Sequence, residues 1–237
     1  MPDLLALDSD SHQLSGFDAG VSKGSVRLRK SFTLQVPGDA ELIGHPATPG
    51  APPPKISEVE RAQKFGEWLR GELREMRIST KQVLICLPRE DTVVRQLEVP
   101  GDIPDNELPD VVRLQAETKI SSSLDQLRLD FLPLPKIGDA PTRDVLMATI
   151  STEAADRLEN SLKAADLEPV SMGLSSVAAM ELVTRAENNH GLPPEGPSLV
   201  LARHGNRLEI SLMRHKQLVF THAAQIGGRV PGLRFGL

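Results

Sequence analysis

Apolar and polar residues alternate along the first part of the chain in short runs separated by polar or glycine-containing turns. Residues 3–7, 14–20 and 25–36 show the period of two that is typical of strands with one covered face. The first turn is the polar stretch "DSDSH", and glycines flank the second turn. The pattern therefore predicts a meander of three antiparallel strands.

The apolar spacing changes to that of a helix over residues 57–77. Ser57 is placed to cap this helix, with Glu60 three residues later as in a capping box. The preceding residues 44–56 are rich in proline, and we interpret them as an exposed insertion. One helix face carries the apolar positions, which are Val59, Ala62, Gly66, Leu69, Leu73 and Met76.

The middle of the chain, residues 81–151, combines strands with a single helix. A helix beginning at Asp105 has one apolar stripe, formed by Leu108, Val112, Ala116 and Ile120. The strands read as "QVLICLP", "TVVRQLEVP", "LRLDFLPLP" and "TRDVLMATI". We expect this region to form one small α+β subdomain.

Two helices and a second meander follow. Thr152 is placed to cap the first of these helices, and the second ends near Gly191. Three strands are then predicted over 198–205, 207–214 and 217–228. Because a meander opens and closes the chain, we expect two related α/β lobes, the second only begun. The predicted segments are 1–80, 81–151, 152–192 and 197–237.

Composition narrows the classes of function. Hydrophobic residues make up 39% of the chain and aromatic residues only 3%, so we expect an aliphatic core. The net charge of −5 lacks the basic balance of a nucleic-acid-binding protein. The single cysteine excludes an internal disulfide and a cysteine-based zinc site. No apolar run reaches the roughly 20 residues of a membrane span, so we expect a soluble cytoplasmic protein.

Several segments in this order resemble the type IV pilus assembly protein PilM family, which is related to FtsA within the actin-like ATPase superfamily. They are "LLALDSDSHQLSGFDA", the stretch from "VLICLPRED" to "LDFLPLP", "AADLEPVSMGLSSVAAMEL" and "LVLARHGNRLEISLMRHKQLVFTHAAQIGG". The resemblance implies an actin-like (RNase-H-like) lobe with a small α+β subdomain inserted at 81–151, and the start of a second lobe. It also implies a place at the cytoplasmic face of the inner membrane, in pilus assembly or a related secretion platform.

The resemblance also locates two nucleotide loops, and both depart from the family pattern. Active members hold phosphate with turns of the type D-x-G-x-x-x-I-K and D-x-G-x-x-T. Here Asp8 matches the first aspartate, but Asp10 replaces the glycine and Ser15 the lysine. In the second loop Ala202 replaces the aspartate and His204 the glycine. The degenerate nucleotide-binding positions are Asp8, Ser9, Asp10, Ser11, His12, Gly205 and Asn206.

These replacements argue against catalysis. A second carboxylate adds repulsion toward a polyphosphate, and the carboxylate that positions magnesium is missing from the second loop. We therefore expect no catalytic residue, no metal site and no cofactor, although binding of ATP with Mg²⁺ stays open. The chain is then expected to act as a non-catalytic scaffold.

The resemblance implies a partner as well. In the family, a cleft between the first lobe and the inserted subdomain receives a short cytoplasmic peptide of an inner-membrane protein. We predict that Leu108 and Val112 belong to the partner-binding surface. Neither a nucleic acid nor a membrane span is expected, and a homo-oligomer stays open.

Two alternatives remain. The chain could be an active PilM-like ATPase cut short, since the family continues beyond "QIGG" into a second large lobe whereas this chain ends in "RVPGLRFGL". Alternatively, Asp8, Asp10 and Asp18 could bind metal ions in an RNase-H-like nuclease. Two features argue against the nuclease. The acidic cluster lacks a clear acidic partner on a later strand, and the surface offers no basic path for a nucleic acid.

Overall fold

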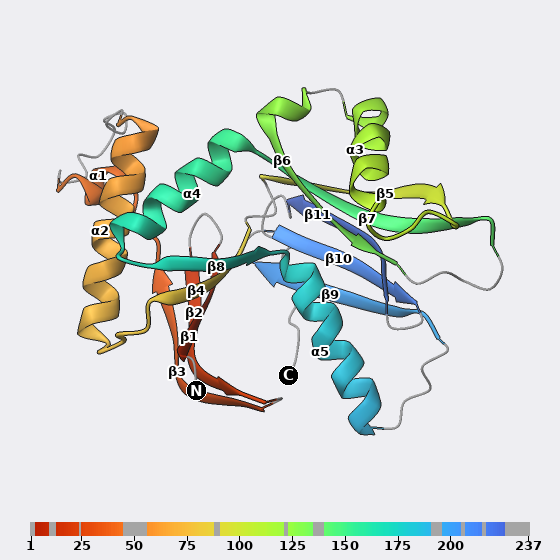
Figure 1. Cartoon of the computed structure of the whole chain (residues 1–237). Coiled ribbons are helices and arrows are strands. Elements are labelled where there is room, and N and C mark those ends of the chain that lie inside the picture. Colours follow the sequence, from red (N-terminus) through yellow and green to blue (C-terminus); the bar gives the residue numbers. More distant parts are fainter. Residues whose placement is uncertain are drawn as a thin grey trace, which may run out of the picture. The chain divides into compact units, whose positions relative to one another are not determined.

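The structure is a computed structural model that describes residues 3–9, 13–23, 25–44, 56–87, 91–120, 123–134, 140–190, 196–204, 207–214 and 217–225 (Figure 1). The chain divides into two compact units, Met1–Ala178 and Ala179–Leu237. We describe each unit by itself.

The first unit contains a five-stranded sheet in the order β3-β2-β1-β4-β8. The strands β1 (Asp3–Ser9), β2 (Gln13–Ser22) and β3 (Ser25–Gln35) form the predicted antiparallel meander. The strands β4 (Gln82–Cys86) and β8 (Glu168–Gly173) extend it in parallel, β4 beside β1 and β8 beside β4. A short helix α1 (Asp39–Leu42) follows the meander.

Two helices, α2 (Glu58–Glu75) and α4 (Thr152–Ala164), pack on one face of this sheet (Figure 1). The cap of α2 is confirmed, because Ser57 Oγ accepts a hydrogen bond from the Glu60 N–H at 3.2 Å. The predicted cap of α4 is wrong by one residue: Ser151 Oγ, not Thr152, accepts from the Ala154 N–H at 3.1 Å. The core between helices and sheet is aliphatic and includes Leu5, Leu7, Leu69, Leu73, Val83, Ile85 and Leu162.

The inserted subdomain is a second sheet with one helix. Its strands β5 (Thr92–Pro100), β6 (Leu127–Pro133) and β7 (Thr142–Ser151) pair antiparallel in the order β5-β7-β6. The helix α3 (Leu108–Lys119) packs on one face of this sheet, and a 3₁₀ turn, η1 (Leu124–Gln126), precedes β6. The helix begins at Leu108 rather than Asp105. Because β4 pairs in the five-stranded sheet, the subdomain begins after β4 and not at residue 81.

The second unit contains most of α5 (Ser175–His190) and the predicted C-terminal meander. The strands β9 (Ser198–His204), β10 (Arg207–Arg214) and β11 (Gln217–Gln225) pair antiparallel in the order β11-β10-β9. Within this unit the Leu218 N–H donates to the sulfur of Met180 at 3.1 Å. Across the described parts of the chain, every helix is too short or too polar to cross a membrane.

Candidate functional site

The first phosphate-loop positions lie at the carboxyl end of β1. Asp8 pairs with Ser15 and Ser9 with Leu14 across the β1–β2 ladder, and both Asp8 and Ser9 are half-buried. Since Leu7 lies on the helix-covered face, Asp8 lies on the opposite face of the sheet. The predicted positions Asp10, Ser11 and His12 lie outside the described residues.

Asp18 does not join Asp8 in a metal site. Asp18 pairs with Leu5, which places it on the helix-covered face, away from Asp8. There its carboxylate accepts hydrogen bonds from Arg29 Nη2 at 2.6 Å, from Arg29 Nε at 3.0 Å and from Thr80 Oγ1 at 2.7 Å. The proposed metal cluster of a nuclease is therefore split between the two faces of the sheet.

The second phosphate-loop positions fall at a hairpin. His204 ends β9 and pairs with Arg207, which begins β10. The predicted positions Gly205 and Asn206 lie outside the described residues. Ala202, which stands where active members have an aspartate, pairs with Glu209.

The two predicted partner contacts belong to the core of the inserted subdomain. Leu108 is 1% exposed and Val112 is 0% exposed. Both pack beneath α3 with Leu97, Val99, Ala116, Val145 and Met147. A direct contact of either side chain with a partner does not fit this structure, because the apolar stripe of α3 is already covered by its own sheet.

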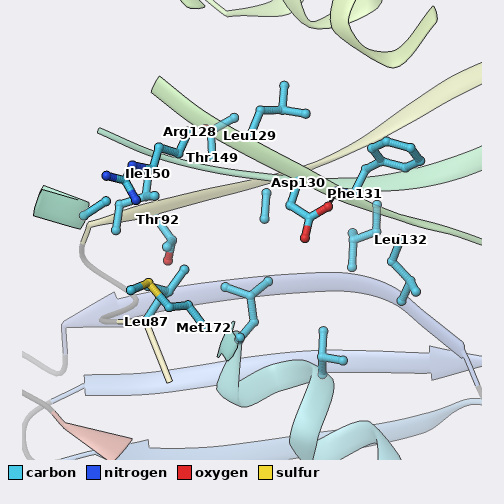
Figure 2. Close-up of a pocket in the computed structure, with 16 residues that line it drawn as sticks. Leu87, Thr92, Arg128, Leu129, Asp130, Phe131, Leu132, Thr149, Ile150 and Met172 are labelled. Atoms are coloured by element: carbon cyan, nitrogen blue, oxygen red, sulfur yellow. Dashed lines mark hydrogen bonds between the residues drawn. The ribbon is translucent and has the colours of Figure 1, made fainter. Parts of the chain in front are cut away.

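A cavity of about 370 Å³ lies on the other face of the same sheet. In Figure 2, the β6 residues Leu129 to Leu132 line one side, and Leu87 and Met172 lie across from them. The wall opposite β6 comes from the end of β8 and the start of α5, all within the first unit. The apolar lining consists of Leu87, Leu129, Phe131, Leu132, Leu146, Ala148, Ile150, Ala155, Met172, Leu174 and Val177.

The alternation of β6 and β7 explains why this face is open. Along β6, Leu127, Leu129 and Phe131 pack against the α3 core, and the alternate positions Arg128 and Leu132 turn to the other face. Leu129 and Phe131 are only partly buried in that core and also line the cavity. Along β7, Val145 and Met147 belong to that core, and the residues between and beyond them line the cavity. The helix α3 covers one face of this sheet, so the second apolar face is available for contact with another surface.

Ion pairs connect residues at and near the cavity to α4. Arg128, which lines the cavity, donates to Asp156 at 2.5 Å and to Glu159, both on α4. The hydrogen bond to Glu159 raises the pKa of the Arg128 guanidinium. Arg157 on α4 similarly donates to Asp91 beside β5 at 3.2 Å. The inserted subdomain is thus tied to α4 at two points near the cavity.

The cavity is not among the sites predicted from the sequence, although the sequence contains a signal for it. The run "VLMATI" in β7 is apolar on both faces, which is typical of a strand covered on both sides. The sequence of this subdomain predicts a single helix, which can cover only one face of the sheet. The unmatched apolar face could have been inferred from that shortfall, but its location against residues 172–177 depends on contacts distant in sequence.

A lobe of five strands and two helices, interrupted by a small α+β subdomain, defines a mixed α/β protein. The model of a protein family described as "Type IV pilus assembly protein PilM" matches residues 55–232. The match covers most of the chain, which therefore belongs to the PilM family. No curated protein matches the sequence.

Solved structures agree with the fold. A structure described as "PilM-PilN type IV pilus biogenesis complex" is 20% identical with a TM-score of 0.74, covering 94% of this chain and 61% of that chain. The cytoplasmic domain of EpsL, an inner-membrane component of the type II secretion system of Vibrio cholerae, is 14% identical with a TM-score of 0.53, covering 94% of this chain and 71% of that one. The predicted α/β fold class is confirmed, and the chain spans 61% of the PilM chain that it matches.

Proposed function

We propose that this chain is a non-catalytic adaptor of a type IV pilus or related secretion assembly platform, and that its cavity holds the cytoplasmic peptide of an inner-membrane partner. The observation that carries this proposal is the apolar cavity on the face of the inserted subdomain's sheet that α3 does not cover. The matched complex pairs PilM with PilN, so we propose a PilN-type membrane protein as the partner.

The lining of the cavity suits a peptide with an apolar anchor. Most of the lining side chains are aliphatic, while Arg128 and Asp130 supply one charge of each sign. Sites of this kind bind by burying apolar groups and use a few polar groups to fix orientation. A peptide that carries an apolar residue beside a charged one would satisfy both features.

The edge of the sheet offers a second means of recognition. Among the described strands, β6 pairs only with β7, so its other side is a sheet edge. An extended peptide can add to such an edge through backbone hydrogen bonds while its side chains enter pockets on one face. Since β6 also lines the cavity, a peptide added there would reach the apolar lining.

The non-catalytic part of the proposal rests on the nucleotide loops. Asp10 and His204 stand where the family pattern has glycine, and Ala202 stands where it has the magnesium-side aspartate. Side chains at glycine positions prevent close approach of backbone N–H groups to phosphate. Loss of the carboxylate removes the positioning of the metal on which phosphoryl transfer depends.

The test is a calorimetric titration of the chain with a synthetic peptide of the partner's N-terminal cytoplasmic segment. Leu132→Arg places a charge at the cavity wall, where Leu132 is 39% exposed, so the substitution leaves the core intact. We expect the affinity for the peptide to fall about tenfold or more, because binding would have to desolvate that charge.

Leu114→Arg is the matched control. Leu114 lies on α3 and is 63% exposed, and α3 covers the face opposite the cavity. The control should bind the peptide as the unmodified chain does. Unchanged binding by Leu132→Arg, or an equal loss in both variants, would contradict the proposed site.

A further inference from the structure

A hollow lined by basic side chains lies at the edge of the five-stranded sheet where the parallel strands β4 and β8 begin. The first phosphate loop lies at the opposite edge, where β1 ends. Asp8 and Ser9 are at the carboxyl end of β1, whereas Lys81 directly precedes the parallel strand β4. Figure 1 shows α2 and α4 leading back to this edge before the chain enters β4 and β8. The hollow therefore belongs neither to the nucleotide loops nor to the peptide cavity.

Four cationic side chains line this hollow, which has a volume of about 430 Å³: Arg70, Arg74, Arg77 and Lys81. The three arginines follow the spacing i, i+4, i+7, which places them along one side of α2 and its continuation. All four are exposed, whereas the floor is buried and apolar, formed by Leu73, Ile78, Ala165 and Leu167. The cations are thus held around a fixed apolar base.

The positive charge of the hollow is largely unbalanced. Among the described residues that line the hollow, Asp166 is the one carboxylate, and it pairs with Lys81. Within the part of the chain that the structure describes, no carboxylate lies within ion-pair distance of Arg70, Arg74 or Arg77. Lys30 adds a further cation at this end, where its Nζ donates to the Met76 carbonyl. This local excess stands out in a chain with a net charge of −5.

Helix termination accounts for only part of the cluster. Cations in the last turn of a helix are favoured by its dipole, which explains Arg74. Arg70 lies a turn earlier and Lys81 lies beyond the helix. Arg77 has φ +55°, a left-handed conformation that ends the helix, with the Ile78 N–H bonded to the Leu73 carbonyl at 2.9 Å. Glycine is the usual residue at this position, so helix geometry does not account for an arginine there.

We propose that this hollow binds the phosphate groups of anionic lipid headgroups, so that this edge of the lobe contacts the membrane surface directly. Guanidinium groups form paired hydrogen bonds with phosphate, and clustered basic side chains are attracted to an anionic leaflet. The compact hollow suits a headgroup better than an extended acidic segment. The choice of a bilayer also rests on the proposed function, which places the chain beside a membrane protein.

The experiment is a flotation assay of the full chain with protein-free vesicles. One set contains phosphatidylcholine alone, and in the other roughly a third of the lipid is phosphatidylglycerol. We expect binding to the anionic vesicles only, weakened by added salt. The double variant Arg70→Glu/Arg74→Glu should lower the partition coefficient about tenfold or more, since each basic side chain contributes about fivefold.

Arg77→Gly separates binding from folding. Glycine adopts the left-handed conformation without steric cost, so this variant should melt at the same temperature as the unmodified chain or higher, yet bind anionic vesicles about fivefold more weakly. Arg95→Glu is the control, because Arg95 is an exposed arginine of β5 outside the hollow. It should bind nearly as well as the unmodified chain.

Three results would overturn the proposal. They are no binding to anionic vesicles, an equal loss in the Arg95→Glu control, and binding to a soluble polyglutamate peptide in place of vesicles, which would indicate an acidic protein partner. Because the vesicles carry no protein, each of these results leaves the peptide-binding proposal standing and distinguishes the two claims.

Discussion

Asp18 is a buried carboxylate on the helix-covered face of the five-stranded sheet, where it is 7% exposed. Burial raises the pKa of its carboxyl, but hydrogen bonds from Arg29 and Thr80 and the charges of Arg29 and Lys30 outweigh that effect, so the pKa is lowered. Arg29 also pairs with Asp3 on β1. One arginine thus links all three strands of the meander to the segment that precedes β4.

This network makes a prediction about acid stability. Because the pKa of Asp18 in the folded state lies below its ordinary value of 3.8, its stabilising contribution is fully present above that pH. The contribution is lost as the pH falls through the folded-state pKa. Asp18→Asn should cost about 1–3 kcal/mol at neutral pH, because the buried donors lose a charged acceptor.

The measurement is thermal unfolding as a function of pH. Asp18→Asn should flatten the decline in melting temperature below pH 3.8 relative to the unmodified chain. Asp125→Asn is the control, since the side chain of Asp125 is 90% exposed. An acid decline as steep in Asp18→Asn as in the unmodified chain would show that the pair does not couple folding to protonation.

At the scale of elements, the contact between α2 and α4 depends on Gly66. A Cβ atom at that position would lie 2.4 Å from the Ser161 carbonyl oxygen and 2.5 Å from the Ala164 Cβ. Contacts of this length cannot exist, so the two helices would have to move apart. The absence of a side chain at Gly66 is therefore what allows α4 to approach α2 and cover the sheet.

Paired substitutions on the same helix test this role. Gly66→Ala should lower the free energy of unfolding by about 1–3 kcal/mol through overpacking. Gly71→Ala should raise it by about 1 kcal/mol, because a Cβ at Gly71 meets no atom within 4 Å and alanine favours the helix. Equal effects of the two substitutions in denaturant unfolding would contradict the close approach at Gly66.

The elements show what a single sequence can predict. Alternation and the Ser57 cap are local signals, and they correctly predicted both meanders and the start of α2. The strand β8 was missed because it contains Pro169 and its residues are mostly exposed, as suits an edge strand. The sheet to which β4 belongs depends on pairing with β1 and β8, which no local pattern encodes.

The candidate site, like the fold, could be predicted only in part from the sequence. The resemblance directs attention to the inserted subdomain, and the apolar spacing identifies the helical stripe of Leu108 and Val112. That stripe was assigned to a partner, although it covers the subdomain's own sheet. To tell an internal apolar face from a partner-binding one, the number of apolar sheet faces must be compared with the number of helices available to cover them.

At the scale of the whole molecule, the proposed peptide site belongs to the first unit alone. Every residue that lines the peptide cavity lies within Met1–Ala178. The comparison with the PilM-PilN complex covers 94% of this chain and 61% of the chain that it matches. Peptide binding can therefore be tested without reference to the second lobe.

Hydrogen–deuterium exchange of the full chain, with the partner peptide and separately with Mg²⁺ and ATP, tests that claim most directly. With the peptide, we predict slower exchange over Leu127–Pro133 and residues 172–177, and no change over α3. With Mg²⁺ and ATP, we predict no change over Asp3–Ser9. Peptide protection confined to α3, or nucleotide protection at the end of β1, would contradict the account of a peptide-binding, non-catalytic adaptor.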